Sequence, residues 1–448
     1  MGEQLNLTRF CDNFPFLNIF KTFRIAVQPA RVLTAFLALL IIFVAGWLMD
    51  FTKTVVVSGS VAQRGYRFSG LTGTVTYPTE LHCFVAAPDS IDRFINSYKD
   101  RPNAEKTGVF NTLSNFCIAR FNLAVISILT LRFDILVSSV TECALALVWA
   151  IKYHIVYTVI FLFFSLVVIS IAGGAICRGA AMQFSKGERV GISSCVKFSL
   201  KKFVSLFFAV LAPIILVASF GYVIILLIGL LANIPWVGEI IFALSFAVVL
   251  FTGAIMAFVA IWALTGGTLM FGAMGYESSD SFDIITRTFI YLRAKPWLLG
   301  FYSVVAAVYG AICYLFVRFL AFLMLILGRY FLAVIMWTKA GKAETINKLD
   351  VLWPQPEFFN LTGNSLEIAK RGTESLAAFI IHLEILAIAA IVFAVAMSFY
   401  FSANSIIYCL LRKKVDNTPM EEVFVAANQI MEQQPEVIEP SAGPEQPE

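Results

Sequence analysis

The sequence contains little charge for its length. Asp, Glu, Lys and Arg make up 14% of its 448 residues, whereas about 25% is usual in soluble domains. Apolar residues make up 59%, and the mean hydropathy is +0.82. So few polar side chains cannot cover so much apolar mass, which excludes a soluble globular protein, a chain disordered throughout, a collagen and a coiled coil. The composition predicts an all-α polytopic membrane protein.

The sequence also lacks the motifs that usually mark enzymes and cofactor sites. It contains no G-x-x-x-x-G-K-[ST], H-E-x-x-H, G-x-S-x-G or G-x-G-x-x-G segment. Its eight cysteines include no C-x-x-C pair, its three histidines are scattered, and its net charge is only +4. We therefore expect no enzymatic activity, no cofactor, no metal site and no nucleic-acid partner.

Long apolar runs, in contrast, are plentiful. A membrane-spanning helix needs about 20 apolar residues. The segments that qualify, and that predict about six transmembrane helices, are 32–49, 155–177, 204–231, 238–265, 297–325 and 377–411. The apolar run before the second of these is interrupted by Arg132, Asp134, Glu142 and Lys152. We therefore assign that run to an external domain, and we expect the overlong helices to project beyond the bilayer.

Basic residues predict the orientation of the helices. The loops 178–203 and 266–296 carry Lys and Arg, whereas the turn 232–238 has none. By the positive-inside rule, we expect both loops and both termini to lie in the cytoplasm. The remaining segments are a cytoplasmic amphipathic N-terminus (1–31), an external domain (50–153), an external segment (334–376) and a cytoplasmic acidic tail, disordered at its end (412–448).

The chain contains an internal similarity. Residues 173–180 are GGAICRGA and residues 266–273 are GGTLMFGA, each at the cytoplasmic end of a predicted span. The glycines of the two pairs are Gly173, Gly174, Gly266 and Gly267. Small residues at such positions favour close packing of helices. The alternative is a ligand site on unwound glycine backbone, as in transporters.

An amphipathic helix follows each glycine pair. The apolar faces with the 3.6-residue period are Ile192, Val196, Leu200 and Phe203 in the first, and Phe282, Ile285, Phe289 and Leu292 in the second. Similar faces occur near the termini, at Phe16, Phe20, Phe23 and Val27 and at Met420, Val423, Phe424, Ala427 and Met431. We interpret the chain as three units, each an interfacial elbow helix followed by a two-span hairpin, closed by a fourth elbow.

The first external segment has mixed secondary-structure signals. Strands are predicted over 54–57, 73–77 and 82–85, and helices over 89–100 and 107–121, which together suggest a small α+β domain. Cys83 and Cys117 both fall in this domain and are candidates for a disulfide in an oxidising compartment, with Cys143 as a competing partner.

Charged residues at membrane depth are the default functional candidates in a membrane protein. Here these are Arg318, Glu384, His382 and Glu239, all toward the outer ends of spans, where a structural role is favoured. Arg318 and Glu384 are the pair we would test first. Asp280, Asp283 and Arg287 open the second elbow helix, where acids suit the helix dipole or form a docking site for a protein partner.

The pattern resembles a known group of sequences. Segments such as GGAICRGAAMQFSKGERVGISSCVKFSLKKF, IPWVGEI and SANSIIYCLLRKKVDNTPMEEVFV resemble multi-pass inner-membrane proteins of planctomycete-type bacteria, over most of residues 170–425. More distantly, the elbow-plus-hairpin pattern is similar to the membrane domain attached to some glycerophosphodiester phosphodiesterases. Neither resemblance implies an activity for this chain.

These observations favour a non-enzymatic membrane scaffold, or an accessory subunit of a bacterial envelope complex, embedded in the lipid bilayer. The alternative is a permease-like transport component whose separate ATPase docks on the cytoplasmic elbow loops. A third hypothesis, a lipid-modifying enzyme, needs a cluster of carboxylate, histidine or arginine at one leaflet, and the sequence offers no convincing one.

Overall fold

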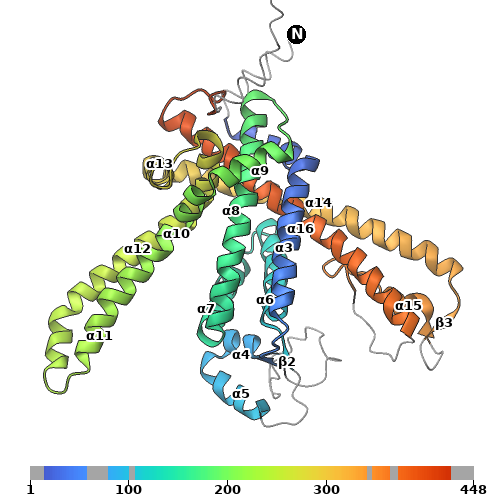
Figure 1. The fold of residues 1–448 in the computed structure, drawn as a ribbon, viewed down its shortest axis with the longest axis horizontal. Helices are drawn as coiled ribbons and strands as arrows, with labels where there is room; N and C mark the ends of the chain where they lie inside the picture. The colour runs from blue at the N-terminus through green and yellow to red at the C-terminus, as the bar shows by residue number, and fades with distance from the viewer. Residues whose placement is uncertain (1–14, 58–78, 100–105, 341–345, 364–371, 425–448) are drawn as a thin grey trace, which may run out of the picture.

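Long helices that diverge from one end of the molecule dominate the fold (Figure 1). The structure is a computed structural model, and it describes residues 15–57, 79–99, 106–340, 346–363 and 372–424. We call the end from which the helices diverge the hub. It consists of the carboxyl-terminal parts of α8 (Ile155–Lys186), α12 (Gly238–Glu277) and α16 (Gly372–Val415), together with the short helices around them.

Among the described residues, eight helices are long and apolar enough to cross a membrane. A multi-pass membrane protein is therefore confirmed in outline, but the number of such helices differs from the six expected. Besides the three named above, they are α3 (Pro29–Met49), α6 (Val109–Leu129), α7 (Phe133–Tyr153), the joined helix Phe203–Ala232 and α14 (Pro296–Ile335). The joined helix contains α10 (Phe203–Ser219), a π-helical segment (Phe220–Ile225) and α11 (Leu226–Ala232).

The additional apolar helices are α6 and α7, which pack against each other inside the segment that we assigned to the external domain. Charges had argued against spans there, but the structure pairs Arg132, Asp134 and Glu142. Arg120 Nε lies 2.6 Å from Glu142 Oε2, between the two helices. Arg132 and Asp134 form an exposed pair at the turn. Pairing lowers the cost of charge in an apolar hairpin, which a count of charged residues cannot show.

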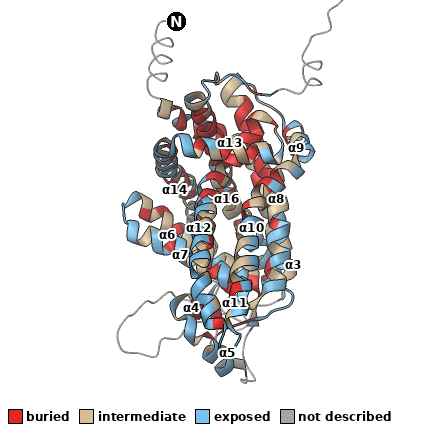
Figure 2. Cartoon of the chain, turned by 90° about the vertical axis from the view of Figure 1, so that its left-hand side faces the viewer, coloured by how far each residue is buried: buried red, intermediate tan, exposed pale blue. Residues whose placement is uncertain are grey.

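The other long helices also associate in pairs. In these pairs α3 packs on α8, the joined helix α10–α11 on α12, and α14 on α16. Away from the hub the pairs separate, and most of their large apolar side chains are exposed (Figure 2). An apolar surface of this extent is what a lipid environment requires.

Short helices surround the hub. They are a 3₁₀ helix (Pro15–Lys21), α2 (Thr22–Ala26), α9 (Ile192–Lys201) and α13 (Ser281–Ala294). Three of them pack on the hub part of a long helix: α2 on α16, α9 on α8 and α13 on α12. The expected fourth elbow helix is wrong for residues 416–424, which follow α16 without a helix. Its remaining positions, Ala427 and Met431, lie outside the described residues.

Small elements lie at the ends of the helix groups away from the hub, α4 and α5 beyond α6–α8 and α15 beside α16 (Figure 1). In an antiparallel pair, β1 (Val55–Val56) joins β2 (Lys106–Thr107), with Val55 opposite Thr107. The other elements are α4 (Glu80–Ala86), a 3₁₀ turn (Pro88–Ser90), α5 (Ile91–Lys99), β3 (Lys339–Ala340), β4 (Ile346–Asn347) and α15 (Lys348–Leu352).

Among the described residues, only part of one strand predicted for the first external segment is present. The strand predicted over 82–85 is wrong, because those residues lie in α4. Thr79 caps this helix by accepting a hydrogen bond from the His82 backbone N–H. The strand predicted over 54–57 is reduced to β1, and the one over 73–77 lies outside the described residues.

The hub is the most completely buried part of the described chain. Residues 172–182 of α8, 269–276 of α12 and 401–411 of α16 are buried on every side of their helices (Figure 2). A helix that is buried all round must be surrounded by protein rather than by lipid or water. The hub is therefore the place where side-chain chemistry is fixed most tightly.

Candidate functional site at the hub

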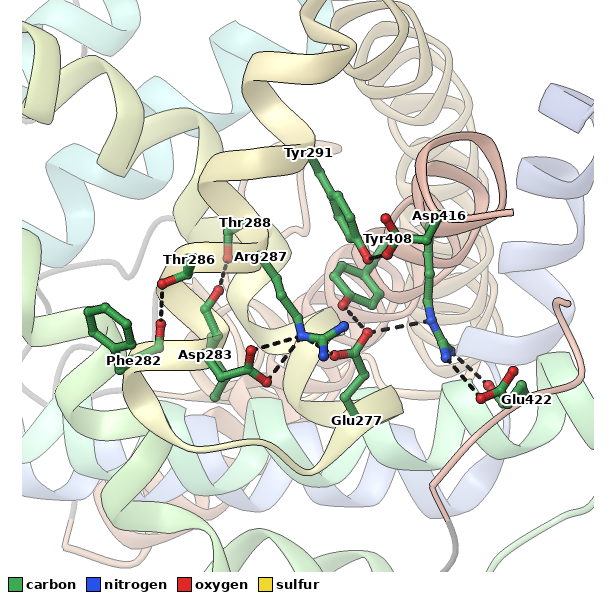
Figure 3. A network of polar contacts seen from close by, with 12 residues as sticks. Glu277, Phe282, Asp283, Thr286, Arg287, Thr288, Tyr291, Tyr408, Asp416 and Glu422 are labelled. Carbon is green, nitrogen blue, oxygen red and sulfur yellow. Dashed lines mark hydrogen bonds and ion pairs between the residues drawn. The ribbon is translucent and has the colours of Figure 1, made fainter. Parts of the chain in front are cut away.

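A buried carboxylate lies at the centre of a charge network in the hub (Figure 3). Glu277 is the last residue of α12, and its side chain is 8% exposed. Tyr408 of α16 donates a hydrogen bond of 2.6 Å to Glu277 Oε1. Arg287 Nε of α13 lies 2.7 Å from Oε2, and Arg412 Nε of α16 lies 3.4 Å from Oε1. One carboxylate therefore joins three helices.

Further carboxylates extend the network on both sides. Arg287 also contacts Asp283, with its Nε 3.0 Å from Oδ1. Arg412 also lies near Glu422 of the segment after α16, with 3.7 Å between Nη2 and Oε1. Along the network the charges alternate, from Asp283 through Arg287, Glu277 and Arg412 to Glu422. Each guanidinium thus lies between two carboxylates, which compensates the cost of burying it.

Two buried tyrosines lie next to the network on its side toward the protein interior. Tyr291 of α13 donates a hydrogen bond to Asp416, and its ring centroid lies 5.4 Å from that of Tyr408. Burial raises the pKa of Tyr291, and the hydrogen bond to Asp416 raises it further. The phenol therefore stays protonated near neutral pH and can act as a donor.

The exposed edge of the network, which we call its rim, contains Asp283 and Arg287, and the pKa values of both residues are shifted. Burial raises the pKa of Asp283, but hydrogen bonds from Ser279 and Arg287, together with the charge of Arg287, outweigh that effect and leave the pKa below its ordinary value. For Arg287, burial lowers the pKa, but Glu277 and Asp283 outweigh it and raise the pKa above its ordinary value. Both residues therefore remain ionised over the physiological range.

The residues that we predicted as a docking site lie on this rim. Asp283 and Arg287 belong to the network, and their side chains are 44% and 38% exposed. Asp280 occupies the N-cap position of α13 without a side-chain capping bond. Its side chain is 90% exposed, and its nearest cation is Lys202 Nζ at 3.8 Å. The three residues are therefore brought close together, with Asp280 the most accessible.

A second buried arginine holds the segment after α16 on the hub. Arg178 of α8 donates hydrogen bonds to the carbonyls of Gly275 (3.0 Å) and Phe424 (2.7 Å). Its guanidinium stacks on Phe198 of α9, 4.5 Å from the ring centroid. The Phe424 N–H in turn donates to the Tyr276 carbonyl at 2.9 Å. Sequence analysis placed Arg178 only among the basic loop residues and missed these contacts.

The glycine pairs lie in unbroken helices, so they do not form the unwound backbone of the alternative hypothesis. A Cβ added at Gly173 would lie 2.7 Å from ring carbons of Phe271 and Phe401, and at Gly174 it would lie 2.5 Å from Ser199 Oγ. At Gly266 the nearest atom would be 3.3 Å away, and at Gly267 nothing lies within 4 Å. Close packing thus explains the first pair better than the second.

The apolar stripes that the sequence suggests are only partly buried: Ile285, Phe289 and Leu292 of α13 pack against the core, but the most deeply buried residues of the short helices lie beside the stripes. In α9 the buried residues are Cys195 and Ser199, while Leu200 of the stripe is exposed. In α13 the buried residues are Ile284, Thr288 and Tyr291, while Phe282 of the stripe is exposed. In α2 the buried residues are Thr22, Ile25 and Ala26. Each of these helices therefore turns a hydroxyl-bearing residue toward the hub.

The predicted charges at membrane depth do not form a common site. Glu239, His382 and Glu384 are all exposed. Arg318 is buried, but its partners differ from the predicted Glu384. They are the Phe358 carbonyl at 2.7 Å, the Tyr314 hydroxyl at 2.5 Å and Asn122 Oδ1 at 3.4 Å. Arg318 therefore fastens α6 and the segment around Phe358 to α14.

The candidate disulfide residues are free thiols here. Cys83 is buried in α4, with its Sγ 3.5 Å from Ser90 Oγ. Cys117 of α6 instead lies near Cys143 of α7, which was named as the competing partner. The structure therefore gives no support to a bond between Cys83 and Cys117.

The chemistry available in the hub is ion pairing and hydrogen bonding. In the part of the chain that the structure describes, no group of three or more His, Cys, Asp and Glu residues could hold a metal ion. The two ends of the Glu277 network reach the surface, where they can contact another protein. No family model, curated protein or solved structure matches this chain.

Proposed function

We propose that this protein is a non-enzymatic scaffold or accessory subunit of an envelope complex in the bacterial inner membrane. In this proposal the long helix pairs lie in the bilayer, and the hub faces the cytoplasm. The acidic rim at Asp280 and Asp283 receives a protein partner.

The observation that carries the proposal is the charge network centred on Glu277. It connects α12, α13 and α16 through alternating charges, so that one arrangement of these helices is favoured over others. Its outer carboxylates are accessible, and charged groups on a rigid support suit specific recognition of a partner with basic residues. Recognition of a partner by these carboxylates does not depend on a bound substrate.

The distribution of basic residues supports the proposed orientation. Exposed Lys and Arg gather on the hub and its short helices, which suits a surface beside anionic lipids on the cytoplasmic side. These residues are Lys21, Arg24, Lys186, Arg189, Lys197, Lys201, Arg293, Lys295 and Lys414.

The arrangement of the short helices supports the interpretation of the chain as three repeated units. Each of α2, α9 and α13 precedes a long helix and buries a hydroxyl residue, namely Thr22, Ser199 or Thr288. The hydroxyls of Ser199 and Thr288 bond to helix carbonyls, which satisfies them inside the hub. The proposal treats these helices as equivalent elbows.

Affinity purification in a mild detergent tests the proposal. The tagged protein is isolated from its native membranes, and co-purifying proteins are quantified by mass spectrometry. We expect one or more envelope proteins in stoichiometric amount, lost in an Asp280→Lys variant because the accessible carboxylate is reversed. The matched control is Asp89→Lys, which reverses an exposed charge at the other end of the molecule.

Two results would contradict the proposal. Recovery of a stoichiometric ATPase would favour the permease-like alternative, in which an energy-supplying subunit docks on the same loops. Recovery of the protein alone, in several detergents, would exclude an accessory subunit. Equal loss of the partner in the Asp280→Lys and Asp89→Lys variants would move the docking surface away from the hub.

A further inference from the structure

The most exposed tryptophans of the chain all lie at ends of long apolar helices. Four of them are between 66% and 90% exposed, namely Trp47, Trp236, Trp297 and Trp337. The first is in the last turn of α3 and the second in the turn between α11 and α12. The third is in the first turn of α14 and the fourth lies two residues after its end. Tryptophan at the ends of membrane-crossing helices is typical of the membrane–water interface, where the ring lies among the headgroups.

The turn between α11 and α12 directs its tryptophan away from the helices. Trp236 has a φ of +69°, a left-handed conformation that is unfavourable for a residue with a side chain. Its neighbours Ile234 and Val237 are also exposed. Within residues 203–276 the only charged residue is Glu239, which is exposed near the same turn. A turn with an indole, apolar neighbours and one carboxylate suits the amphipathic headgroup region better than water or the hydrocarbon core.

The tryptophan at the hub end has basic neighbours. Trp297 directly follows Pro296, the first residue of α14. Arg293 and Lys295 lie just before it, and both are exposed. Tryptophan together with basic residues is typical of the cytoplasmic interface of a membrane, where anionic lipids attract the cations. One interface is therefore indicated at the beginning of α14, and Trp337 indicates the other near its end.

Two helices are too long to cross a bilayer upright. Both α12 and α14 contain 40 residues, which corresponds to about 60 Å. A bilayer with its headgroups is about 40–45 Å thick, so helices of this length either project into water or tilt by about 45°. Large apolar side chains are exposed up to the ends away from the hub, such as Ile240 in α12 and Ile335 in α14. Exposure of these side chains to water is unfavourable, which favours the tilt.

The directions of the helices agree with this interpretation. In Figure 1, α12 and α14 are inclined to opposite sides of α8. In contrast, α3 has 21 residues, and its length of about 32 Å is close to the thickness of the hydrocarbon core. A short helix that crosses upright and long helices that cross obliquely can end at the same interface.

We propose that the four exposed tryptophans lie in the headgroup regions of a phospholipid bilayer. Trp297 lies in the interface beside the hub, and Trp47, Trp236 and Trp337 lie in the opposite interface. Helices α12 and α14 then cross the bilayer obliquely and end at its far surface, instead of projecting beyond it as we expected from the sequence. This proposal requires a membrane protein, but it is independent of the scaffold function.

Fluorine NMR of the full-length protein tests the depth of each indole. The protein is labelled with fluorotryptophan in nanodiscs of phosphatidylcholine and phosphatidylglycerol, and each resonance is assigned by replacing that tryptophan with phenylalanine. One sample contains a lipid with a nitroxide on its headgroup, a second a lipid with a nitroxide at the end of an acyl chain, and a third a water-soluble paramagnetic agent. We expect the headgroup nitroxide to cause the largest loss of signal for all four tryptophans, because interfacial indoles lie nearest to it.

Two variants provide matched controls within the same helices. Phe251→Trp and Phe316→Trp each place an indole at an exposed position, where the larger ring should not disturb the fold. Phe251 lies fifteen residues after Trp236, and Phe316 lies near the middle between Trp297 and Trp337. At the proposed tilt, Phe251 lies about 16 Å below the far interface, near the centre of the hydrocarbon core. For both added indoles, the acyl-chain nitroxide should cause the largest loss of signal.

Three results would overturn the proposal. Loss of the Trp236 or Trp337 signal mainly with the water-soluble agent would show that the helix projects into water. Loss mainly with the acyl-chain nitroxide would show that the helix ends inside the hydrocarbon core. A stronger response of Phe251→Trp or Phe316→Trp to the headgroup nitroxide would exclude an oblique crossing. None of these results depends on whether a partner binds at Asp280, so failure of this proposal is distinguishable from failure of the scaffold function.

Discussion

The hub contains two groups of arginines whose charges are balanced in different ways. Arg287 and Arg412 share the carboxylate of Glu277, and each has a second carboxylate nearby. Arg31 and Arg178 have only carbonyl oxygens as hydrogen-bond acceptors among the described residues. Carbonyl groups carry partial charges, so the second group keeps a positive potential that the first has lost.

This difference indicates that the helices are held together in different ways on the two sides of the hub. On the Glu277 side, opposite charges fasten helices to one another, and truncation of the shared carboxylate leaves two cations facing each other. On the other side, backbone carbonyls position the guanidinium groups of Arg31 and Arg178. Loss of the shared carboxylate should therefore cost more stability than loss of contacts between a guanidinium and backbone carbonyls.

The largest expected effect is that of Glu277→Ala. The substitution leaves Arg287 and Arg412 without their common partner, and loss of a buried partner should reduce the free energy of unfolding by about 3 kcal/mol. Unfolding by heat in micelles measures the change. Glu422→Ala is the control, because its side chain is 63% exposed and its pair with Arg412 is longer. Equal losses in both variants would show that the burial of Glu277 adds nothing to the free energy of unfolding.

A smaller loss is expected for Arg178→Met. The variant keeps much of the side-chain volume but frees the carbonyls of Gly275 and Phe424, which should cost about 2 kcal/mol. The segment after α16 should become accessible to protease between residues 416 and 424. Lys186→Met, at an exposed position on the same helix, should leave cleavage unchanged. Protection that persists in Arg178→Met would mean that other contacts hold this segment.

Local periodicity predicted the short helices but only part of the faces that they bury. The predicted apolar stripes include Leu200 in α9 and Phe282 in α13, yet both side chains are exposed. In a membrane protein, lipid is as apolar as the core, so large apolar residues are not driven to the interior. Small and hydroxyl-bearing residues, such as Ser199 and Thr288, are the ones that allow helices to approach. Hydropathy could therefore identify the face toward the hub only in part.

The sequence predicted only the part of the charge network that lies within one helix. Asp283 and Arg287 are four residues apart on one helix, a spacing that is visible in the sequence. Glu277 and Tyr408 are 131 residues apart, and only the tertiary fold brings them together. Tyr408 and Arg412 share a face of α16, and this i,i+4 spacing was a signal that sequence analysis did not use. No such local pattern connects Arg178 with Phe424.

Two glycines of α12 should respond oppositely to alanine. At Gly275 an added Cβ would lie 2.9 Å from the backbone of Cys177, so Gly275→Ala must separate α8 from α12 and should cost about 1–2 kcal/mol. At Gly267 nothing lies within 4 Å, and Gly267→Ala should stabilise the helix by up to about 1 kcal/mol. Thermal unfolding distinguishes them. A loss in both variants would mean that Gly267 faces a partner absent from the isolated chain.

The smallest expected effect is on the rim of the network and depends on pH. The pKa of Asp283 lies below its ordinary value of 3.8, so its stabilising contribution is present above that pH and is lost as pH falls through the folded-state pKa. The side chain is 44% exposed, and Asp283→Asn should therefore cost only about 0.5 kcal/mol near neutral pH. Unfolding temperatures measured from pH 6 to pH 3 should converge for the variant and the unmodified protein. A difference that grows on acidification would show that Asp283 stabilises the hub by some means other than its charge.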